Sequence, residues 1–157
     1  MFEGRPLTVV VPAHNEERLI EQVLDTMPSF VDRIVVVDDA STDATMACLA
    51  AVLGRLGSER LRIVKHDRNR GVGAAIVSGY EAALEEVAER GEGFVAVMAG
   101  DAQMDPDYLP ALLDPIVDQG YGFTKANRFY SATSFEGMPK VRVFGNIVLT
   151  SYLVYWR

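Results

Sequence analysis

The chain has 157 residues, which is long enough for one domain with a hydrophobic core. Apolar residues make up 49% and charged residues 24%, a balance typical of a soluble globular protein. The formal net charge of −7 argues against a general nucleic-acid-binding protein, which needs a basic face. The single cysteine, Cys48, excludes an internal disulfide and fits a reducing, cytoplasmic compartment, and two distant histidines, His14 and His66, suggest no zinc site.

The first expected elements are two apolar strands with a helix between them. Residues 7–13 (LTVVVPA) form a near-continuous apolar run, which predicts a strand buried on both faces. Asn15 can cap a helix over residues 16–27, which has acidic residues early and Pro28 after its end. Residues 33–39 (RIVVVDD) repeat the strand pattern and end in two acids.

The middle of the chain continues the same alternation. Ser41 or Thr42 can cap a helix that runs to about residue 56, and Gly57 is a typical residue to end it. Residues 61–66 (LRIVKH) predict a third strand. A basic turn, DRNRGVG, follows that strand.

The next helix and strand are also clear. Residues 74–90 predict a helix, and residues 94–100 (FVAVMAG) predict a fourth strand. Asp105 and Pro106 are typical of a helix start, and Pro115 predicts a kink or a split in that helix. The run YGFTKANRF is compatible with a fifth strand, and the last segment, from Val141, predicts a helix with an apolar face.

Strands that alternate with helices, each strand apolar throughout, predict an α/β fold with a mostly parallel sheet and helices on both faces. In such sheets, ligands bind at the carboxyl ends of the strands, near a topological switch point. Polar residues follow each of the four strands: His14-Asn15-Glu16, Asp38-Asp39, Arg68-Asn69-Arg70-Gly71 and Asp101-Ala102-Gln103. We therefore expect one binding site built from four loops.

The loop residues have ordinary structural roles as well as functional ones. Asn15 serves equally well as a helix cap, and Asp105 before Pro106 is best explained as one. Two adjacent acids exceed what a turn needs, which favours a binding role for Asp38 or Asp39. Asp101 and Gln103 project similarly from an extended segment, and their oxygens suit Mg²⁺ or Mn²⁺.

Basic residues gather in two places of this acidic chain. Arg68 and Arg70 precede Gly71 and Gly73, whose freedom lets the backbone approach a ligand closely. A second cluster lies towards the C-terminus and is either solvated surface charge or a phosphate site. It consists of Lys125, Arg128, Lys140 and Arg142.

Taken in order, these motifs resemble the family 2 glycosyltransferases of the GT-A fold. The branch they resemble most is that of the polyprenyl-phosphate sugar transferases, of the dolichyl-phosphate mannose synthase type. The likeness rests on VVVPAHNEE, IVVVDDASTDAT, NRGVGAAIVSGYEAAL, GDAQMDPDYLPALL and ANRF, which cover the chain to about residue 130.

The resemblance implies an inverting enzyme that moves a sugar from a nucleotide-diphosphate sugar to an acceptor, which we expect to be a polyprenyl phosphate. Asp101 and Gln103 match ligands of a Mg²⁺ or Mn²⁺ cofactor, and Asp101 and Arg128 match catalytic groups at the diphosphate. Lys140 and Arg142 are weaker candidates for the acceptor phosphate. The residues implied for the nucleotide-sugar are Pro12, His14, Glu16, Asp38, Asp39, Arg70 and Gly71.

Two departures from the family pattern stand out. The family usually carries Asp-x-Asp where this chain has Ala99-Gly100-Asp101, so one metal carboxylate is missing. Relatives of the branch also usually run well past this length. We expect one catalytic domain over residues 1–157, with the nucleotide-sugar part at 1–130 and the start of an incomplete acceptor and membrane-proximal part at 131–157.

Other readings remain open from the sequence. The chain could be a truncated module that binds a nucleotide without transfer, or a metal-dependent nucleotidyltransferase, although no Gly-rich phosphate loop follows the first strand. The apolar run from Ile147 to Trp156 is compatible with a core helix, with a homodimer contact, or with peripheral attachment to the cytoplasmic face of a membrane.

Overall fold

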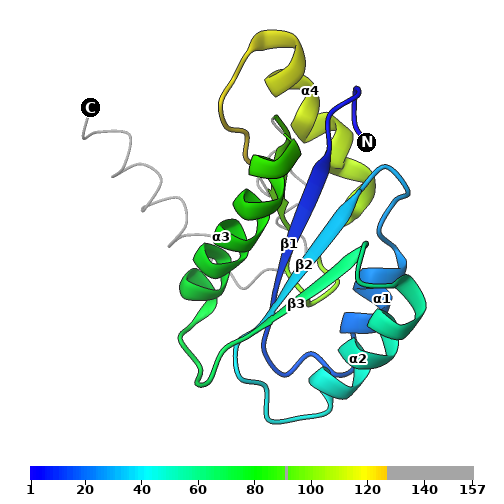
Figure 1. The fold of residues 1–157 in the computed structure, drawn as a ribbon, viewed down its shortest axis with the longest axis vertical. Helices are drawn as coiled ribbons and strands as arrows, with labels where there is room; N and C mark the ends of the chain where they lie inside the picture. Colours follow the sequence, from blue (N-terminus) through cyan, green and yellow to red (C-terminus); the bar gives the residue numbers. More distant parts are fainter. Residues whose placement is uncertain (91, 127–157) are drawn as a thin grey trace, which may run out of the picture. The chain divides into compact units, whose positions relative to one another are not determined.

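The computed structural model describes residues 1–90 and 92–126 (Figure 1). The chain divides into two compact units, Met1–Asp114 and Pro115–Arg157. The first unit contains the whole described sheet and all the loops singled out by the sequence. The functional division expected at residue 130 stays a prediction.

The sheet has four parallel strands in the order β3-β2-β1-β4. The predicted parallel α/β fold is therefore confirmed. β1 spans Leu7–Ala13, as predicted, while β2, β3 and β4 end one to three residues earlier than expected because the chain turns into loops there. Their bounds are Arg33–Asp38, Leu61–Lys65 and Phe94–Val97. The order reverses at β1, whose neighbours are β2 and β4, so the switch point lies at its carboxyl end.

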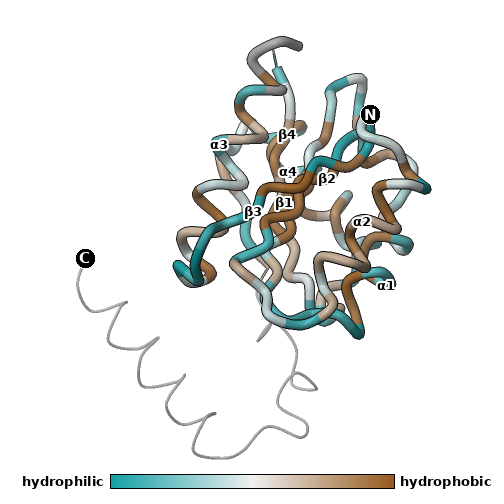
Figure 2. Tube along the Cα trace, turned by 60° about the horizontal axis from the view of Figure 1, so that its bottom comes forward, coloured by the Kyte–Doolittle hydropathy of each residue, from teal (hydrophilic) through white to brown (hydrophobic). Residues whose placement is uncertain are grey.

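Helices cover both faces of the sheet (Figures 1 and 2). α1 (Ile20–Asp25) and α2 (Thr45–Leu56) contact each other on one face. α3 (Val72–Arg90) packs on the other face against β1 and β2, whose strongly apolar tubes lie between these layers in Figure 2. This sandwiching explains why the strand sequences are apolar on both sides. The fully buried strand residues include Val9, Val10, Val11, Ile34, Val35, Val36 and Val37.

One glycine sets how closely α3 approaches the sheet. A Cβ added at Gly79 would lie 2.1 Å from Val10 Cγ1, which is less than any real contact of that kind. Only glycine therefore allows α3 to lie this close to β1. At the start of α3, Val72 and Ala75 lie beside Ala13 and His14 at the end of β1.

The first helix is shorter than predicted, and Asn15 does not cap it. Asn15 has a φ of +57°, and the backbone N–H of Glu16 donates to Thr45 Oγ1 (2.8 Å) in the loop after β2. The backbone before Ile20 is thus committed to contacts between loops, and α1 begins only where these contacts end.

The second helix also starts differently from the prediction. Neither Ser41 nor Thr42 caps α2, whose N-cap position is Ala44 with no side-chain cap. Asp43 Oδ1 instead accepts the backbone N–H of Thr45 at 2.9 Å. Gly57 ends α2 with a φ of +80°, and its N–H donates to Leu53 O, as predicted for a C-terminal glycine.

The last described elements are a 3₁₀ turn, η1 (Pro106–Tyr108), and α4 (Leu109–Gln119). Asp105 Oδ1 accepts the N–H of Asp107 at 3.0 Å, so its predicted capping role is confirmed. α4 continues through Pro115, so the helix is not split there, and the alternative of a kink stays a prediction. A proline removes one backbone donor only, and the rest of the helix is retained around it.

Two further predictions concern the C-terminal part. Residues 121–126 contain no strand, and the remainder of the run expected to form a fifth strand lies outside the described residues. The helix expected from Val141 lies outside them too. In the described part of the chain, no helix combines the length and the apolar character that a membrane crossing needs.

Candidate functional site

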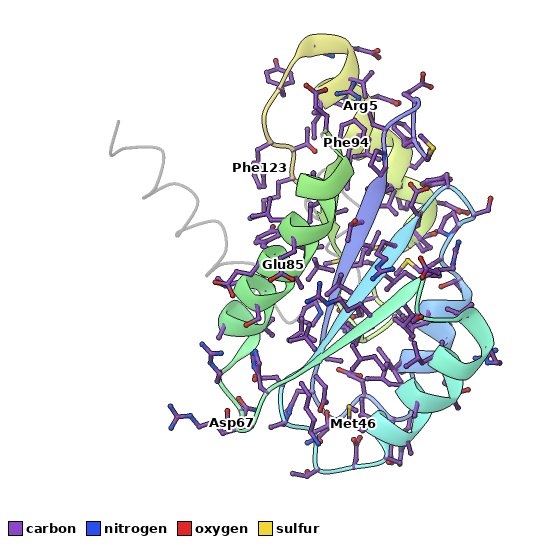
Figure 3. The ribbon with its side chains drawn as sticks, viewed as in Figure 1. Arg5, Met46, Asp67, Glu85, Phe94 and Phe123 are labelled. Atoms are coloured by element: carbon purple, nitrogen blue, oxygen red, sulfur yellow. The ribbon has the colours of Figure 1, made fainter. Side chains whose placement is uncertain are left out.

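The loops after all four strands meet at a pocket of about 300 Å³. In Figure 3, Asp67 and Met46 lie towards the carboxyl ends of the strands, where this pocket is formed, and Arg5 and Phe94 lie at the opposite end. The start of α3 completes the wall. The lining residues are Pro12, Ala13, His14, Glu16, Asp39, Asn69, Gly71, Val72, Ala75, Ala99, Gly100 and Asp101.

The structure brings half of the predicted site residues together in this pocket. Those that line it are Pro12, His14, Glu16, Asp39, Gly71 and Asp101. Asp38, Arg70 and Gln103 belong to the same loops but are not among the lining residues. Arg128, Lys140 and Arg142 lie outside the described residues. The gathering of six predicted residues follows from the parallel sheet, which places the loops after all four strands on one edge.

Asp39 is the most firmly held side chain of the pocket. It is 3% exposed, and its carboxylate accepts three hydrogen bonds. The backbone N–H of Arg70 and a ring nitrogen of His66 bind Oδ1 at 2.8 and 2.6 Å, and the N–H of Gly71 binds Oδ2 at 2.7 Å. The carboxylate thereby joins the loop after β2 to the loop after β3.

These bonds determine the ionisation of Asp39. Burial by itself raises the pKa of this carboxyl, but the hydrogen bonds from Arg70, His66 and Gly71 outweigh burial and hold the pKa below its ordinary value. Asp39 is therefore an anion over the whole neutral range. It offers the pocket a fixed hydrogen-bond acceptor.

Asp38, its neighbour, is buried in a different way. It is 0% exposed, and its Oδ1 accepts the N–H of Ser41 at 3.2 Å. Its Oδ2 is buried without a hydrogen-bond partner among the described residues. Asp38 thus stabilises the turn after β2, while Asp39 is the member of the pair that faces the pocket.

The loops after β1 and β2 are tied to each other by side chains bonded to backbone. The His14 ring donates from Nδ1 to Asp39 O at 2.8 Å, because a carbonyl only accepts. The N–H of Asn15 donates to Ser41 Oγ (2.9 Å), and Asn15 Oδ1 accepts the N–H of Thr42 (2.8 Å). The amide that the sequence assigned to a helix cap therefore links two loops.

A second set of bonds extends this link towards α2. Besides the bond from Glu16 N–H to Thr45, the N–H of Glu17 donates to Asp43 Oδ2 at 3.2 Å. In return, Glu17 Oε2 accepts the N–H of Ala44 at 2.9 Å. The motifs AHNEE and DDASTDAT thus form one structural unit, which we call the loop lace (residues 14–17 with 39–45).

The loop after β4 is held by bonds within itself and by backbone bonds to β1. Asp101 Oδ1 accepts the N–H of Gln103 at 3.1 Å, and the N–H of Ala99 points to the Met104 sulfur at 3.5 Å. Two backbone bonds reach β1, from Met98 N–H to Val10 O at 2.9 Å and from Gly100 N–H to Pro12 O at 3.2 Å. Ala99 lines the pocket, so a methyl group stands at the position where the resemblance implies an acid.

Glu16 and Asp101 interact across the pocket. The pKa of Glu16 is raised, first by burial and then by the negative charges of Asp101 and Asp43, and the nearby His14 offsets part of this rise. Because Asp101 and Asp43 add negative charge around Glu16, a cation is favourable at this place in the pocket. This electrostatic effect is the main chemical property of the loop after β4.

Each of the four loops contains one residue with a left-handed backbone. These residues have φ values between +56° and +86°. Only one of them is a glycine and one an asparagine, the types that tolerate this conformation best, so the two alanines are held there by their surroundings. The residues are Asn15, Ala40, Gly71 and Ala102.

Sequence reasoning missed two residues that serve the pocket from outside. His66, 6% exposed, binds Asp39, and its other ring nitrogen lies 3.0 Å from Ser78 Oγ on α3. The signal was present, because His66 ends the third predicted strand at the same sheet edge as the other polar residues. Within the described residues, no group of three His, Cys, Asp or Glu side chains could hold a metal ion by itself.

The sequence matches the model of "Glycosyl transferase family 2" over residues 8–155. The chain belongs to this family. The pocket of this family 2 domain is formed by the loops that contain the motifs of the resemblance.

Named relatives agree with the polyprenyl-phosphate branch. The domain is 26% identical to UDP-N-acetylglucosamine–dolichyl-phosphate N-acetylglucosaminyltransferase of Methanococcus voltae, over 90% of this chain and 59% of the relative. It is 39% identical to dodecaprenyl-phosphate galacturonate synthase of Rhizobium johnstonii, over 70% of this chain and 32% of the relative. The domain therefore covers between about a third and three fifths of the length of these two proteins.

Solved structures agree with the GT-A fold. A mannosyltransferase from Pyrobaculum calidifontis, in complex with GDP-mannose and Mn²⁺, superposes with a TM-score of 0.55 at 28% identity. It is covered over 34% of its length by 74% of this chain. Glucosyl-3-phosphoglycerate synthase from Mycobacterium tuberculosis gives a TM-score of 0.53 at 29% identity, over 73% of this chain and 41% of its own.

Proposed function

We propose that this family 2 domain binds a nucleotide-diphosphate sugar in the pocket and is the donor-binding part of a glycosyltransferase that transfers the sugar, with inversion, to a polyprenyl phosphate. Support comes from the relatives, two of which are named for dolichyl or dodecaprenyl phosphate, and from structures determined with GDP-mannose or UDP.

The observation that carries this proposal is the position of Asp39 in the pocket. A buried carboxylate with three fixed donors presents its remaining acceptor capacity to a ligand, which suits a base N–H or a ribose hydroxyl. Pro12, His14 and Gly71 line the same pocket and would enclose the nucleoside. The volume of about 300 Å³ lies at the lower end of the range for small-molecule sites.

The chemistry of the loop after β4 fits a divalent cation carried in with the diphosphate. A diphosphate entering beside Glu16 and Asp101 meets like charge; burial first and then the charge of Asp101 raise the pKa of Glu16. Asp101 would be the protein ligand of Mg²⁺ or Mn²⁺, with phosphate oxygens and water completing the shell, as is usual for Mg²⁺. When bound, the cation would neutralise charge on the leaving diphosphate.

The groups of the chain itself act by binding and orientation. The loop lace and Asp39 hold the nucleoside, which fixes the position of the sugar carbon relative to the diphosphate. A polyprenyl phosphate is anionic at neutral pH and can attack without a general base. Arg128, Lys140 and Arg142 are proposed to face phosphate groups, and the C-terminal part is proposed to meet the membrane surface where such an acceptor resides.

A thermal-shift series tests donor binding directly. The protein is heated with UDP, GDP, dTDP or CDP, each with and without Mn²⁺, and Asp101→Asn is treated in the same way. At a concentration of about one hundred times Kd, a bound nucleotide adds about 2.7 kcal/mol of stability. We expect one nucleotide to stabilise the protein more with Mn²⁺ and to lose this increment in Asp101→Asn. No shift with any nucleotide contradicts the proposal.

One observation favours a second function, nucleotide binding without transfer. Ala99 lines the pocket with a methyl group at the position where the family pattern has an acid. Incubation with UDP-sugars or GDP-mannose, Mn²⁺ and a short polyprenyl phosphate separates the two. Nucleotide binding combined with no release of nucleoside diphosphate would support the binding module.

A further inference from the structure

His66 is a buried polar side chain for which nucleotide binding alone gives no role. It follows β3, is 6% exposed, and does not line the pocket. Its ring bridges two elements: Nδ1 lies 2.6 Å from Asp39 Oδ1, and Nε2 lies 3.0 Å from Ser78 Oγ on α3. A buried ring with both nitrogens engaged has a single orientation.

The partners of the ring determine which nitrogen carries the proton. The ionised carboxylate of Asp39 only accepts, so Nδ1 of His66 donates to it. In the neutral ring, Nε2 then accepts from the Ser78 hydroxyl, and in the charged ring the hydroxyl turns and accepts. The bond to Asp39 is retained in both states, because only the hydroxyl has to rotate.

The hydrogen bonds of Asp39 show what the bond from His66 does. Oδ1 is saturated by His66 and the Arg70 N–H, while Oδ2 accepts only the Gly71 N–H among the described donors. The acceptor capacity left to a ligand is therefore on Oδ2. Without the His66 bond, the carboxylate could rotate and exchange its two oxygens, and that acceptor would no longer have a fixed direction.

We infer that His66 is a positioning residue for nucleoside recognition, acting through Asp39 and itself anchored to α3 by Ser78. The inference rests on the proposed function, since the ligand class is the nucleoside of the donor. It assigns the ring a task beyond packing, namely to aim one carboxylate oxygen at an N–H or O–H of the nucleoside. The diphosphate end of the ligand lies outside its influence.

Two substitutions separate this task from packing. An asparagine side chain places its amide nitrogen near the position of the histidine Nδ1, whereas a glutamine side chain reaches towards the position of Nε2. His66→Asn therefore keeps the donor to Asp39 and loses the contact with Ser78. His66→Gln does the reverse, and both remove the ring to a similar extent.

Isothermal titration of the full chain with UDP, GDP and inorganic pyrophosphate, each with Mn²⁺, is the test. We expect His66→Gln to raise the Kd of the nucleotide that the wild type binds by about tenfold or more. This loss of affinity is typical of a lost hydrogen bond to a charged group. His66→Asn and Ser78→Ala should stay within about threefold of the wild type. Pyrophosphate binding should be the same in all four proteins.

Several results would overturn the inference. Equal weakening by Asn and Gln would reduce His66 to a packing residue, and equal weakening of pyrophosphate would show a general loss of the pocket. If the wild type binds neither UDP nor GDP and none of the four nucleotides stabilises it in the thermal-shift series, the proposed function fails together with the inference. If the wild type binds a nucleotide and the His66→Asn and His66→Gln variants bind it with equal affinity, only the inference fails.

A measurement on the wild type removes dependence on the folding of the variants. The hydrogen-bonded Nδ1 proton of His66 can be followed by ¹⁵N-edited NMR. We expect its resonance to move on addition of the bound nucleotide, because the ligand shares the Asp39 carboxylate, and to remain in place with pyrophosphate. No movement with saturating nucleotide contradicts the positioning role.

Discussion

The two sides of the pocket are built in contrasting ways. On one side, the loop lace and Asp39 join three loops through bonds between side chains and backbone. On the other side, the loop after β4 is held by bonds within itself and by backbone bonds to Val10 and Pro12 of β1. The first side is preorganised before a ligand arrives. The second side offers few side chains that could bind a metal ion.

This difference separates recognition from chemistry. Preorganised acceptors favour tight binding of a nucleoside, because little has to be ordered on binding. Asp101 is the acid that the loop after β4 contributes to the pocket lining, so any cation there would depend largely on the oxygens of the diphosphate. If the proposed function holds, substitutions can accordingly change nucleoside binding and sugar transfer one at a time.

The largest expected effect comes from removing the central anion of the preorganised side. Asp39→Ala leaves the N–H groups of Arg70 and Gly71 and the His66 ring without their acceptor in a buried place. We expect a loss of about 3–5 kcal/mol in the free energy of unfolding, measured in urea. Asp101→Ala is the matched control and should change it by about 0.5 kcal/mol or less. Similar losses in both would show that the two sides are equally constrained.

The pH dependence of stability gives the next effect. The pKa of Asp39 is below its ordinary value of 3.8 in the folded protein, so the anion stabilises the fold above that value. This contribution is lost as the pH falls from about 4 through the lowered pKa. We expect the stability difference between the wild type and Asp39→Asn to be constant from about pH 5 to 7 and to shrink below about pH 4. A constant difference down to about pH 2 would contradict it.

A substitution on the poorer side should sharpen the comparison in the other direction. Ala99→Asp adds a carboxylate to the pocket beside Asp101, and we expect it to tighten nucleotide binding in the presence of Mn²⁺ by about tenfold, or 1.4 kcal/mol. In chelator the same variant should bind no better than the wild type, because the added charge repels the diphosphate. Ala99→Asn, of the same shape without the charge, serves as the control in both titrations.

The smallest expected effect concerns the two left-handed alanines. Glycine removes the strain of a positive φ, worth about 1–2 kcal/mol, but loses up to about 1 kcal/mol through the entropy of the unfolded chain. We expect Ala40→Gly and Ala102→Gly each to stabilise the fold by about 0.5 kcal/mol. The gain should be larger at Ala40, in the constrained side, since the loop of Ala102 can relax. Thermal unfolding of both variants measures these gains, and a larger gain for Ala102→Gly than for Ala40→Gly would contradict the expected order.

Much of the fold could be predicted because each strand is apolar on both faces, and a parallel sheet then places the loops after its strands at one edge. The gathering of Glu16, Asp39 and Asp101 follows from that rule. The role of Asn15 could not be predicted, because its partner Thr42 lies on another loop and local patterns favour a cap. His66 was undervalued for the same reason, since its significance depends on Asp39 and Ser78.

The loop lace also has a consequence for building chimeras with related transferases. Most of its bonds pair a side chain of one loop with the backbone of the other, as in Asn15 with Thr42 and Glu17 with Ala44. Exchanging residues 14–17 alone would therefore leave donors and acceptors of residues 39–45 unmatched. The two segments are better transplanted as one cassette, whereas residues 99–104 can be exchanged by themselves.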